Sequence, residues 1–388
     1  MPTAQTIIAG YVDDLIRIRR ELHQHPEVGF EVPHTAEFVA RQLESFGIAV
    51  TRGIGKTGVV GTISGDKGPG RSIGLRAELD ALPIEEATNL PYRSKTPGFS
   101  HACGHDGHMA MLLGAARYLA ETRDFAGTAT FIFQPAEEGQ GGARAMLADG
   151  LFDRFPCDEI YALHNDPGGP RGRIRLRSGA TSAAADFFDI AIQGRGAHAA
   201  QPHQAVDPVA VAVAIAQSLP TIVGSNVDPL HPAVLCVTRI EAGNSYNVIP
   251  DQAVLSGTIR TFDTQARNIV ASRLREICAG IAGAYNATAE AKIRDVFSVL
   301  ENWPEQTAAA TAIAADLFGT DNVDPDTPPR LTSEDFADML AVVPGSYFFL
   351  GQQAGPALHN AGYNFDDEII PMGVRLLASL VQRRSTAA

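Results

Sequence analysis

The stretch "SHACGHDGHMAML", residues 100–112, concentrates side chains that could do chemistry. The chain has only eleven histidines and four cysteines, yet this stretch holds His101, Cys103, His105, Asp106 and His108. Apolar residues then recur at helical spacing, so Cys103 and His105 are predicted to lie in the turn that enters a helix. A thiolate and an imidazole two residues apart are good ligands for a divalent metal. A buried cysteine beside a capping histidine would give the same pattern.

A second stretch, "FIFQPAEEGQGGARAML", places two carboxylates after a predicted strand that ends at Gln134. Adjacent side chains on an extended chain point in opposite directions, so Glu137 and Glu138 are expected to have different roles. One could bind a metal while the other holds a proton, whereas a solvated acidic turn is the plain alternative. A phosphate-binding loop is disfavoured because Arg144 replaces the third glycine of the dinucleotide fingerprint.

Other polar residues follow strands of the same predicted sheet. Asp80 follows the strand that begins at 72, His164 ends a strand in "EIYALH", and His359 lies in a polar loop before the last helix. Open α/β sheets place their sites at the carboxyl edge of the strands. These groups together outnumber the three ligands of a usual single-metal site, so they favour two metal ions.

Residues 183–295 supply a further set of candidates. His198 lies in the glycine-rich loop "GRGAHAAQPH", which could approach another surface closely. Asn247 and Arg260 follow in "NSYNVIPDQA" and "SGTIRTF". Arginine suits bidentate carboxylate recognition, although a surface arginine and a turn asparagine would look the same.

The order of predicted elements indicates two domains. The first 180 residues alternate helices (11–23, 35–46, 105–121, 141–149) with strands (58–64, 72–79, 128–134, 159–164), which is typical of an α/β domain with a mixed, mostly parallel sheet. Residues 183–295 read as β-α-β-β-α-β, a ferredoxin-like α+β unit. Helices 306–318, 333–341 and 369–384 and a strand at 346–351 follow. We therefore expect a discontinuous domain, residues 1–182 and 296–388, with 183–295 inserted in it.

Composition narrows the class of protein. The net charge of −13 disfavours nucleic acid or an anionic membrane surface as a partner. Four widely spaced cysteines favour a reduced, cytoplasmic protein without a disulfide framework. The N-terminus lacks a cationic start followed by an apolar run, and no segment has eighteen consecutive apolar residues, so neither a signal peptide nor a membrane span is predicted.

These motifs together resemble the dinuclear-metal amidohydrolases that include aminoacylase and carboxypeptidase G. The resemblance is strongest to the branch of hippurate hydrolase, auxin-conjugate hydrolases and N-acyl-amino-acid deacylases. It runs over essentially the whole chain, from "LRAELDALPIEE" through "SEDFADML" to "LHNAGYNFDDEIIP". It implies a zinc-peptidase type of α/β fold whose insert is a dimerisation or lid domain.

The resemblance also implies roles for individual residues. The metal ligands would be Cys103, His105, Glu138, His164 and His359. Glu137 would be the general base and acid, and His198 would hold the oxyanion in the partner subunit's active site. Asn247 and Arg260 would hold the substrate carboxylate, and Asp80 would support the metals. His108 receives no role.

Two positions depart from the pattern of the branch. Glu78 stands where aspartate is common, which could alter the support behind the metals. Asp166 stands where an aromatic residue is frequent, and an extra carboxylate there could weaken the binding of aryl or acidic substrates.

The implied activity is hydrolysis of the amide bond of N-acetyl, N-benzoyl or similar L-amino acids by a metal-activated water. The cofactors would be two divalent ions, Mn, Zn, Co or Ni, and the insert would form a homodimer or homotetramer. A dipeptidase, or an aminohydrolase that releases ammonia from an aryl amine or primary amide, could use the same residues. A metal-dependent binding protein without turnover is the alternative from another class, but it would leave Glu137 unexplained.

Overall fold

The computed structural model describes residues 3–386 and separates into two compact units. The first contains the chain up to Thr181, Glu301–Pro328 and the chain from Asp335 onward. The second contains Ser182–Leu300 and Pro329–Glu334. Its end lies beyond 295, where the insert was predicted to end, because strand β13 continues to Phe297.

An eight-stranded sheet, in the order β1-β2-β4-β3-β5-β16-β6-β15, is the framework of the first unit. The neighbours β4-β3-β5-β16 run parallel, and the pairs β1–β2, β2–β4 and β16–β6 are antiparallel. The strands are β1 (Ala49–Ile54), β2 (Gly58–Ser64), β3 (Ser72–Glu78), β4 (Thr128–Gln134), β5 (Glu159–Asp166), β6 (Ile174–Arg175), β15 (Val323–Asp324) and β16 (Gly345–Gly351). The predicted α/β class with a mixed, largely parallel sheet is confirmed. The short strands β6 and β15 and the strand β1 were not predicted.

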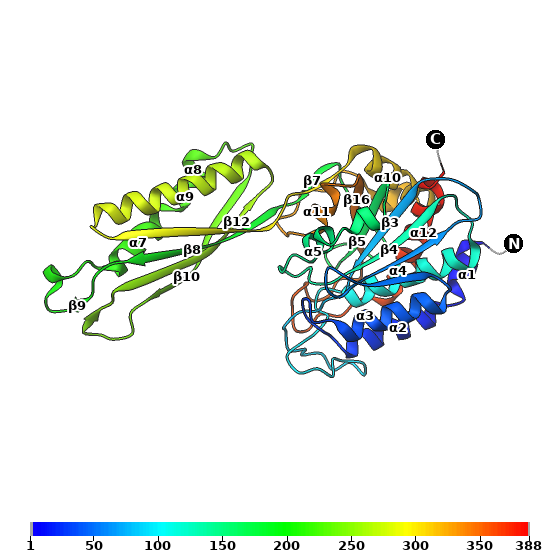
Figure 1. The fold of residues 1–388 in the computed structure, drawn as a ribbon, viewed down its shortest axis with the longest axis horizontal. Helices are drawn as coiled ribbons and strands as arrows, with labels where there is room; N and C mark the ends of the chain where they lie inside the picture. Colours follow the sequence, from blue (N-terminus) through cyan, green and yellow to red (C-terminus); the bar gives the residue numbers. More distant parts are fainter. Residues whose placement is uncertain (1–2, 387–388) are drawn as a thin grey trace. The chain divides into compact units, whose positions relative to one another are not determined.

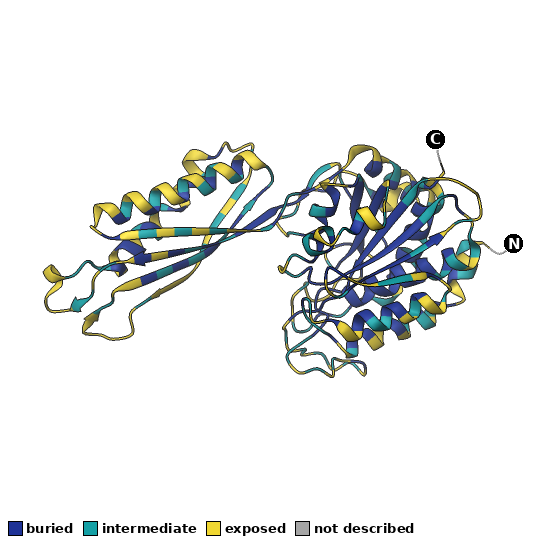
Figure 2. Ribbon diagram, in the orientation of Figure 1, coloured by how far each residue is buried: buried dark blue, intermediate teal, exposed yellow. Residues whose placement is uncertain are grey.

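Helices cover both faces of this sheet (Figure 1). They are α1 (Ala4–Ala9), α2 (Val12–Gln24), α3 (Pro33–Ser45), α4 (His105–Thr122), α5 (Gly142–Ala148), α6 (Leu151–Arg154), α10 (Pro304–Phe318), α11 (Phe336–Leu340) and α12 (Ile370–Arg384), with 3-10 turns η2 (Thr320–Asn322) and η3 (Asp367–Ile369). Apart from the edge strand β1, the longer strands between them are buried almost throughout (Figure 2), as expected for a sheet covered on both faces.

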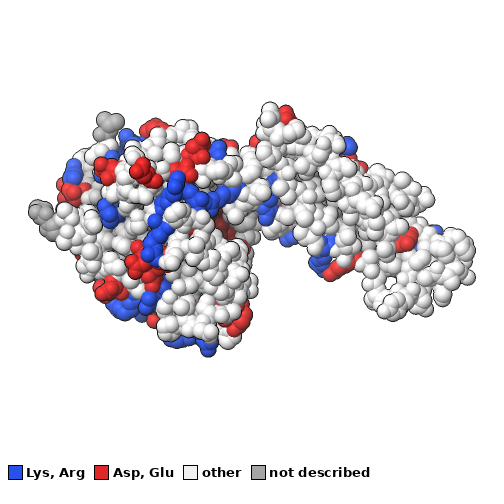
Figure 3. All heavy atoms as spheres, turned by 180° about the vertical axis from the view of Figure 1, so that it is seen from behind, with Lys and Arg blue, Asp and Glu red and all other residues white. Residues whose placement is uncertain are grey.

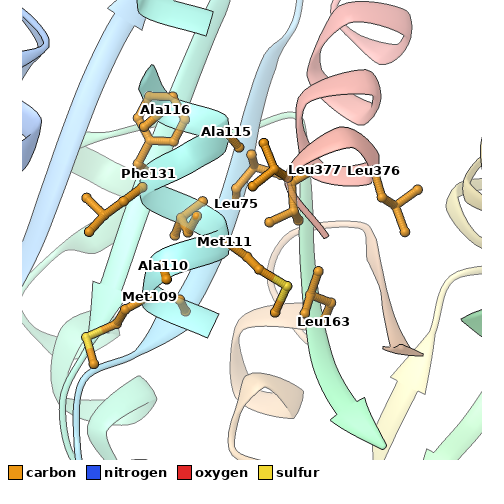
Figure 4. Packing of buried hydrophobic residues seen from close by; sticks show 14 of the residues in the cluster. Leu75, Met109, Ala110, Met111, Ala115, Ala116, Phe131, Leu163, Leu376 and Leu377 are labelled. Atoms are coloured by element: carbon orange, nitrogen blue, oxygen red, sulfur yellow. The ribbon is translucent and has the colours of Figure 1, made fainter. Parts of the chain in front are cut away.

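Helix α4 is the most buried helix of this unit and begins at one of the candidate ligands. Met109 and Met111 are fully buried, and the helix packs between the sheet and α12 (Figure 4). A Cβ at Gly373 of α12 would lie 2.0 Å from the Met111 sulfur, so a larger residue there would push the helices apart. Tight packing on all sides fixes the position of the N-terminus of α4.

The second unit is a four-stranded antiparallel sheet, in the order β10-β12-β8-β13, covered by helices. Its elements are β8 (Ala184–Gln193), β9 (Ala197–His198), η1 (Pro202–Gln204), α7 (Pro208–Ser218), α8 (Pro220–Asn226), β10 (Ala233–Ala242), β11 (Val248–Ile249), β12 (Gln252–Thr261), α9 (Thr264–Ala284) and β13 (Thr288–Phe297). Two further short strands, β7 (Gly179–Ser182) and β14 (Leu300–Asn302), pair with each other. The small ribbon of β9 and β11 was not predicted.

One segment of this unit, Pro208–Asn226, is long and apolar enough by composition to cross a membrane, with a mean hydropathy of 1.5. It consists of the two helices α7 and α8, and Pro220 begins the second. Val211, Ile215 and Ile222 are fully buried in the core of the second unit. The apolar face of the segment therefore packs against the sheet.

Candidate metal centre

The loop before α4 places Cys103 and His105 at the carboxyl edge of the sheet. Gly104 caps the helix with a φ of 90°, a conformation that glycine adopts without strain. His105 Nδ1 donates to the carbonyl oxygen of Asp80 at 2.7 Å. This bond directs the buried Nε2 atom, which has no hydrogen-bond partner, toward Glu137 and Glu138, with 4.0 Å to a carboxylate oxygen of each.

The two adjacent glutamates are held by a carboxylate from the neighbouring strand. The backbone N–H groups of Glu137 and Glu138 each donate to one oxygen of Asp80, at 3.1 Å. Ala136, directly before them, has a φ of 57°, which is uncommon for a residue with a side chain. Asp80 therefore fixes the turn that carries both glutamates.

The two remaining histidines approach from β5 and from the loop after β16. His164 lies two residues before the end of β5, and its Nδ1 donates to the Asn165 carbonyl oxygen at 2.7 Å. Its Nε2 lies 3.4 Å from Cys103 Sγ. His359, with a φ of 61°, donates its backbone N–H to Ala102 and places Nε2 3.4 Å from Glu138 Oε1.

All five predicted ligands thus lie together, in two groups that share Cys103. One group is Cys103, His105 and His164, and the other is Cys103, Glu138 and His359; within each group the ligand atoms lie within 4.8 Å of one another. His105 Nε2 is a buried polar atom without a hydrogen-bond partner, a costly state that a bound cation relieves, and buried Glu138 Oε1 has His359 Nε2 beside it at 3.4 Å. Sulfur, imidazole nitrogen and carboxylate oxygen are ligands that Zn and similar divalent ions accept. The residues fit a pair of divalent cations.

The electrostatics of these groups also favour cations. Burial raises the pKa of the Cys103 thiol well above its usual range, and the charges of Glu138 and Glu137 raise it further. Burial lowers the pKa of His105 and of His164, so both imidazoles are in the neutral form that binds metals. Burial would raise the pKa of Glu138, but the hydrogen bond from His359 and the charge of His105 outweigh it and lower the pKa. A divalent cation reverses the conditions that keep the thiol protonated.

A second layer of buried polar residues, which the sequence did not predict, stands behind the ligands. Arg76 is fully buried and binds Glu78 and Asp335, and its Nε donates to Gln134 at 3.0 Å. His108 Nδ1 donates to Glu78 at 2.7 Å. Two spacings could have revealed this layer. Arg76, Glu78 and Asp80 alternate along one side of β3 and its extension, and His105 and His108 are neighbours on one helix face.

Glu78 and Asp166, the two positions that depart from the pattern of the resembled branch, each contact oppositely charged or hydrogen-bonding side chains. Glu78 contacts Arg76 and His108, whose charges outweigh its burial and hold its pKa well below the usual range. Asp166 is 4% exposed and forms an ion pair with Arg175. Its charge is therefore compensated inside the first unit.

The remaining candidates lie in the second unit, and the structure brings only two of them together. His198 on β9 pairs with Val248 on β11, and the N–H of Ala199 donates to the carbonyl of Asn247. Arg260 lies toward the other end of β12, paired with Ala185, whereas Gln252 pairs with Gln193 near the ribbon. The eight residue-to-residue steps from Gln252 to Arg260 span about 26 Å.

Comparisons with known proteins agree with this geometry. Residues 74–383 match the model of peptidase family M20/M25/M40. A hippurate hydrolase from Campylobacter jejuni is 40% identical over 364 residues, covering 94% of each chain. An N-acetylcysteine deacetylase from Bacillus subtilis is 39% identical over 368 residues, covering 94% of this chain and 95% of that one. The crystal structure of a dinuclear metal-binding peptidase from Bacillus subtilis superposes with a TM-score of 0.83 at 36% identity, covering 96% and 98% of the two chains.

Proposed function

Because this chain belongs to peptidase family M20/M25/M40, we propose that it hydrolyses the amide bond of N-acyl L-amino acids, releasing a carboxylate and the free amino acid. The observation that carries the proposal is one buried carboxylate, Glu137, beside five side chains suited to two metal ions. Relatives along nearly the whole chain bear the names hippurate hydrolase and N-acetylcysteine deacetylase, which supports this substrate class.

Two divalent cations, Mn, Zn, Co or Ni, are the proposed cofactors. Cys103, His105 and His164 would hold one, and Cys103, Glu138 and His359 the other. Bound there, they would polarise the amide carbonyl and lower the pKa of a water molecule. The rest of the chemistry falls to side chains of the chain itself.

Glu137 is the general base and acid. It is 6% exposed, and Asp80 holds its backbone in place. It accepts the proton of the attacking water and delivers it to the leaving nitrogen. Both carboxylates lie 4.0 Å from His105 Nε2, but Glu138 also approaches His359 Nε2 at 3.4 Å, which suits it to the role of metal ligand.

His198 is the donor to the oxyanion. It is exposed on the ribbon of β9 and β11, and its Nδ1 accepts the N–H of Ala200 at 3.1 Å. In the neutral imidazole the proton then lies on Nε2, which faces away from this bond and can donate. An exposed N–H donor of fixed tautomer is suited to donate to a substrate bound at the active site of another subunit.

We assign Asn247 and Arg260 to the substrate carboxylate, from two different subunits. About 26 Å of strand separates Arg260 from the ribbon that carries Asn247 and His198, and an N-acyl amino acid is far shorter. One subunit would supply Arg260, and its partner would supply Asn247 with His198. The proposed assembly is a homodimer, or a homotetramer built from it, in the cytoplasm.

The surface of the second unit supports an interface between copies. Strand β10 is an edge of its sheet, and its Val234 and Ile240 are 38% and 55% exposed. Figure 3 shows few Lys, Arg, Asp or Glu side chains over this unit on the face in view. Exposed apolar edge strands are normally covered in soluble proteins.

The test is a panel of N-acetyl, N-benzoyl and indoleacetyl L-amino acids, supplied with Mn, Zn, Co or Ni in turn. Release of the free amino acid with the acyl carboxylate supports the proposal. Release of ammonia from primary amides or aryl amines would instead identify an aminohydrolase, and cleavage of dipeptides alone would identify a dipeptidase. No turnover of any compound with any metal would favour a binding protein.

A further inference from the structure

Among the histidines of residues 100–112, His108 packs against the proposed ligands but has no role in the proposed reaction. It is 2% exposed and lies one helical turn after His105 on α4. Its ring centroid is 4.6 Å from that of His164, with the planes at 70°, and 5.5 Å from that of His105. It therefore contacts two proposed ligands without belonging to the group that contains Cys103.

Both nitrogens of this ring are occupied. Nδ1 donates to Glu78 Oε2 at 2.7 Å, and Glu78 is anchored in turn by Arg76. Nε2 lies 2.7 Å from Asn165 Oδ1 and 3.1 Å from the Asn165 backbone nitrogen. A ring bonded at both edges cannot flip or tilt without breaking a buried hydrogen bond, which is costly.

Asn165, the far anchor, is itself immobilised. Its side-chain N–H groups donate to Gln352 at 3.1 Å and to the hydroxyl of Tyr363 at 2.7 Å. Tyr363 donates to the same Gln352 oxygen at 3.2 Å. A Cβ at Gly104 would lie 2.4 Å from Asn165 Oδ1, so the loop that carries Cys103 packs directly on this anchor.

The position of the His164 ring depends on this arrangement, because its own hydrogen bond leaves one rotation of the ring unrestrained. The bond from Nδ1 to the Asn165 carbonyl sets which nitrogen faces Cys103, but the ring could still rock about that bond. The ring of His108 lies across it in an edge-on contact and removes the space for rocking. The chain Arg76–Glu78–His108–Asn165 thus joins two strands, β3 and β5, and the helix α4 behind one imidazole.

We propose that His108 is a positioning residue of the metal centre, which holds the His164 imidazole in register with Cys103 and His105 through its bonds to Glu78 and Asn165. The proposal rests on the metal centre of the proposed function. It also gives the departure at Glu78 a purpose, because the longer side chain of glutamate reaches the His108 ring.

The experiment measures the dissociation constant of Co²⁺ by competition with a chelator, together with the visible absorption of bound Co²⁺, which reports ligand geometry. His108→Phe keeps a ring of similar size and removes both hydrogen bonds. We expect it to weaken Co²⁺ binding about 10–100-fold, the usual cost of losing a residue that supports a ligand, and to change the absorption bands. His108→Asn keeps a donor near Glu78 and should weaken binding less.

The matched control is Leu119→Ala, at a fully buried residue eleven positions after His108 on the same helix, roughly 16 Å away. It should lower the melting temperature but leave the Co²⁺ dissociation constant unchanged. Wild-type Co²⁺ binding by His108→Phe would overturn the proposal, and so would equal weakening by Leu119→Ala. If His108→Phe does not fold, His108→Asn decides: weaker binding with shifted bands supports the proposal, and a wild-type constant with wild-type bands overturns it.

Failure of the proposed function gives a different result. It would show as a wild-type protein that binds no Co²⁺, or that binds it and turns over no N-acyl amino acid. A wild-type protein that binds two ions and hydrolyses these substrates, with His108→Phe indistinguishable from it in Co²⁺ binding, would remove only the role of His108.

Discussion

The metal centre of the first unit and the ribbon of β9 and β11 in the second unit are built in opposite ways. At the metal centre, His105 is 1% exposed and Asp80 fully buried, and both are bonded to another strand or loop; among the five proposed ligands only His359 is exposed. On the ribbon, His198 and Asn247 are exposed, and their side-chain hydrogen bonds run to residues two positions away in the chain. The first region is complete within its own unit, whereas the second offers donors to something outside it.

The difference separates two requirements of the proposed catalysis. Ligands for two cations must be preorganised, because moving buried polar groups during the reaction is costly. An oxyanion donor on an exposed ribbon can arrive with the closing surface and exclude water when it does. Substitutions at the centre should therefore change metal binding, chemistry or folding, whereas substitutions on the ribbon should change chemistry alone.

The largest effect is expected at Glu137. Glu137→Ala removes the group that carries the proton, which should lower kcat about 10²–10⁴-fold. Because Glu137 lies outside both ligand groups that share Cys103, the variant should keep its metal content, measured by elemental analysis. Wild-type turnover of N-acyl amino acids by this variant would contradict the assignment of the base.

His198→Ala should come next, with a loss of about 10²–10³-fold in kcat, the cost of one oxyanion donor. Its metal content and urea midpoint should match the wild type, because the side chain is exposed. Mixed dimers of His198→Ala and Glu137→Ala subunits should regain part of the activity when sites are shared between chains. Activity no higher than that of either parent variant would mean that each subunit works alone.

Cys103→Ser should weaken metal binding rather than the chemical step. The shared thiolate becomes a hydroxyl, a poorer ligand, and both groups lose a member. The loss of affinity should exceed the roughly 10–100-fold expected for a supporting residue. A variant with full metal content and full activity would remove the thiolate from the ligand set.

An effect on stability rather than on activity is expected from His23, a buried residue of α2 behind the centre. Burial lowers its pKa, but hydrogen bonds to Asp106 and Glu86 outweigh burial and raise the pKa from 6.5 to about 9. The folded state thus binds the proton more tightly than the unfolded one. The stabilisation, about 3 kcal/mol, is complete below pH 6.5 and is lost as the pH rises through 9.

Urea unfolding at pH 6.5 and pH 9.5 measures this contribution. The wild type should lose stability between the two values, and His23→Gln should lose about 3 kcal/mol less. The ribbon variant His198→Ala should follow the wild type at both values. A pH dependence of His23→Gln equal to that of the wild type would show that His23 carries no charge in the folded protein.

Much of the fold was predictable because its signals are local. The strands Gly58–Ser64 and Thr128–Gln134 have the bounds that the sequence pattern predicted. The helix start at His105 follows from a glycine and the apolar residues after it. The strands β6 and β15 were not predicted, because a strand of two residues is too short to show an alternation of apolar and polar residues. Both strands form only by pairing with partners distant in the chain.

The sequence by itself determined the residue types at the carboxyl edge of the sheet, the order of the elements and the chemistry those side chains can do. Only the tertiary structure decided that Cys103 belongs to both ligand groups, that Asp80 holds the backbone of Glu137, and that Glu78 meets His108. The reason is physical. Hydrophobic periodicity and turn-forming residues reflect interactions between neighbours in the chain. These contacts instead join residues on different strands and helices, and the packing of the sheet decides which of them meet.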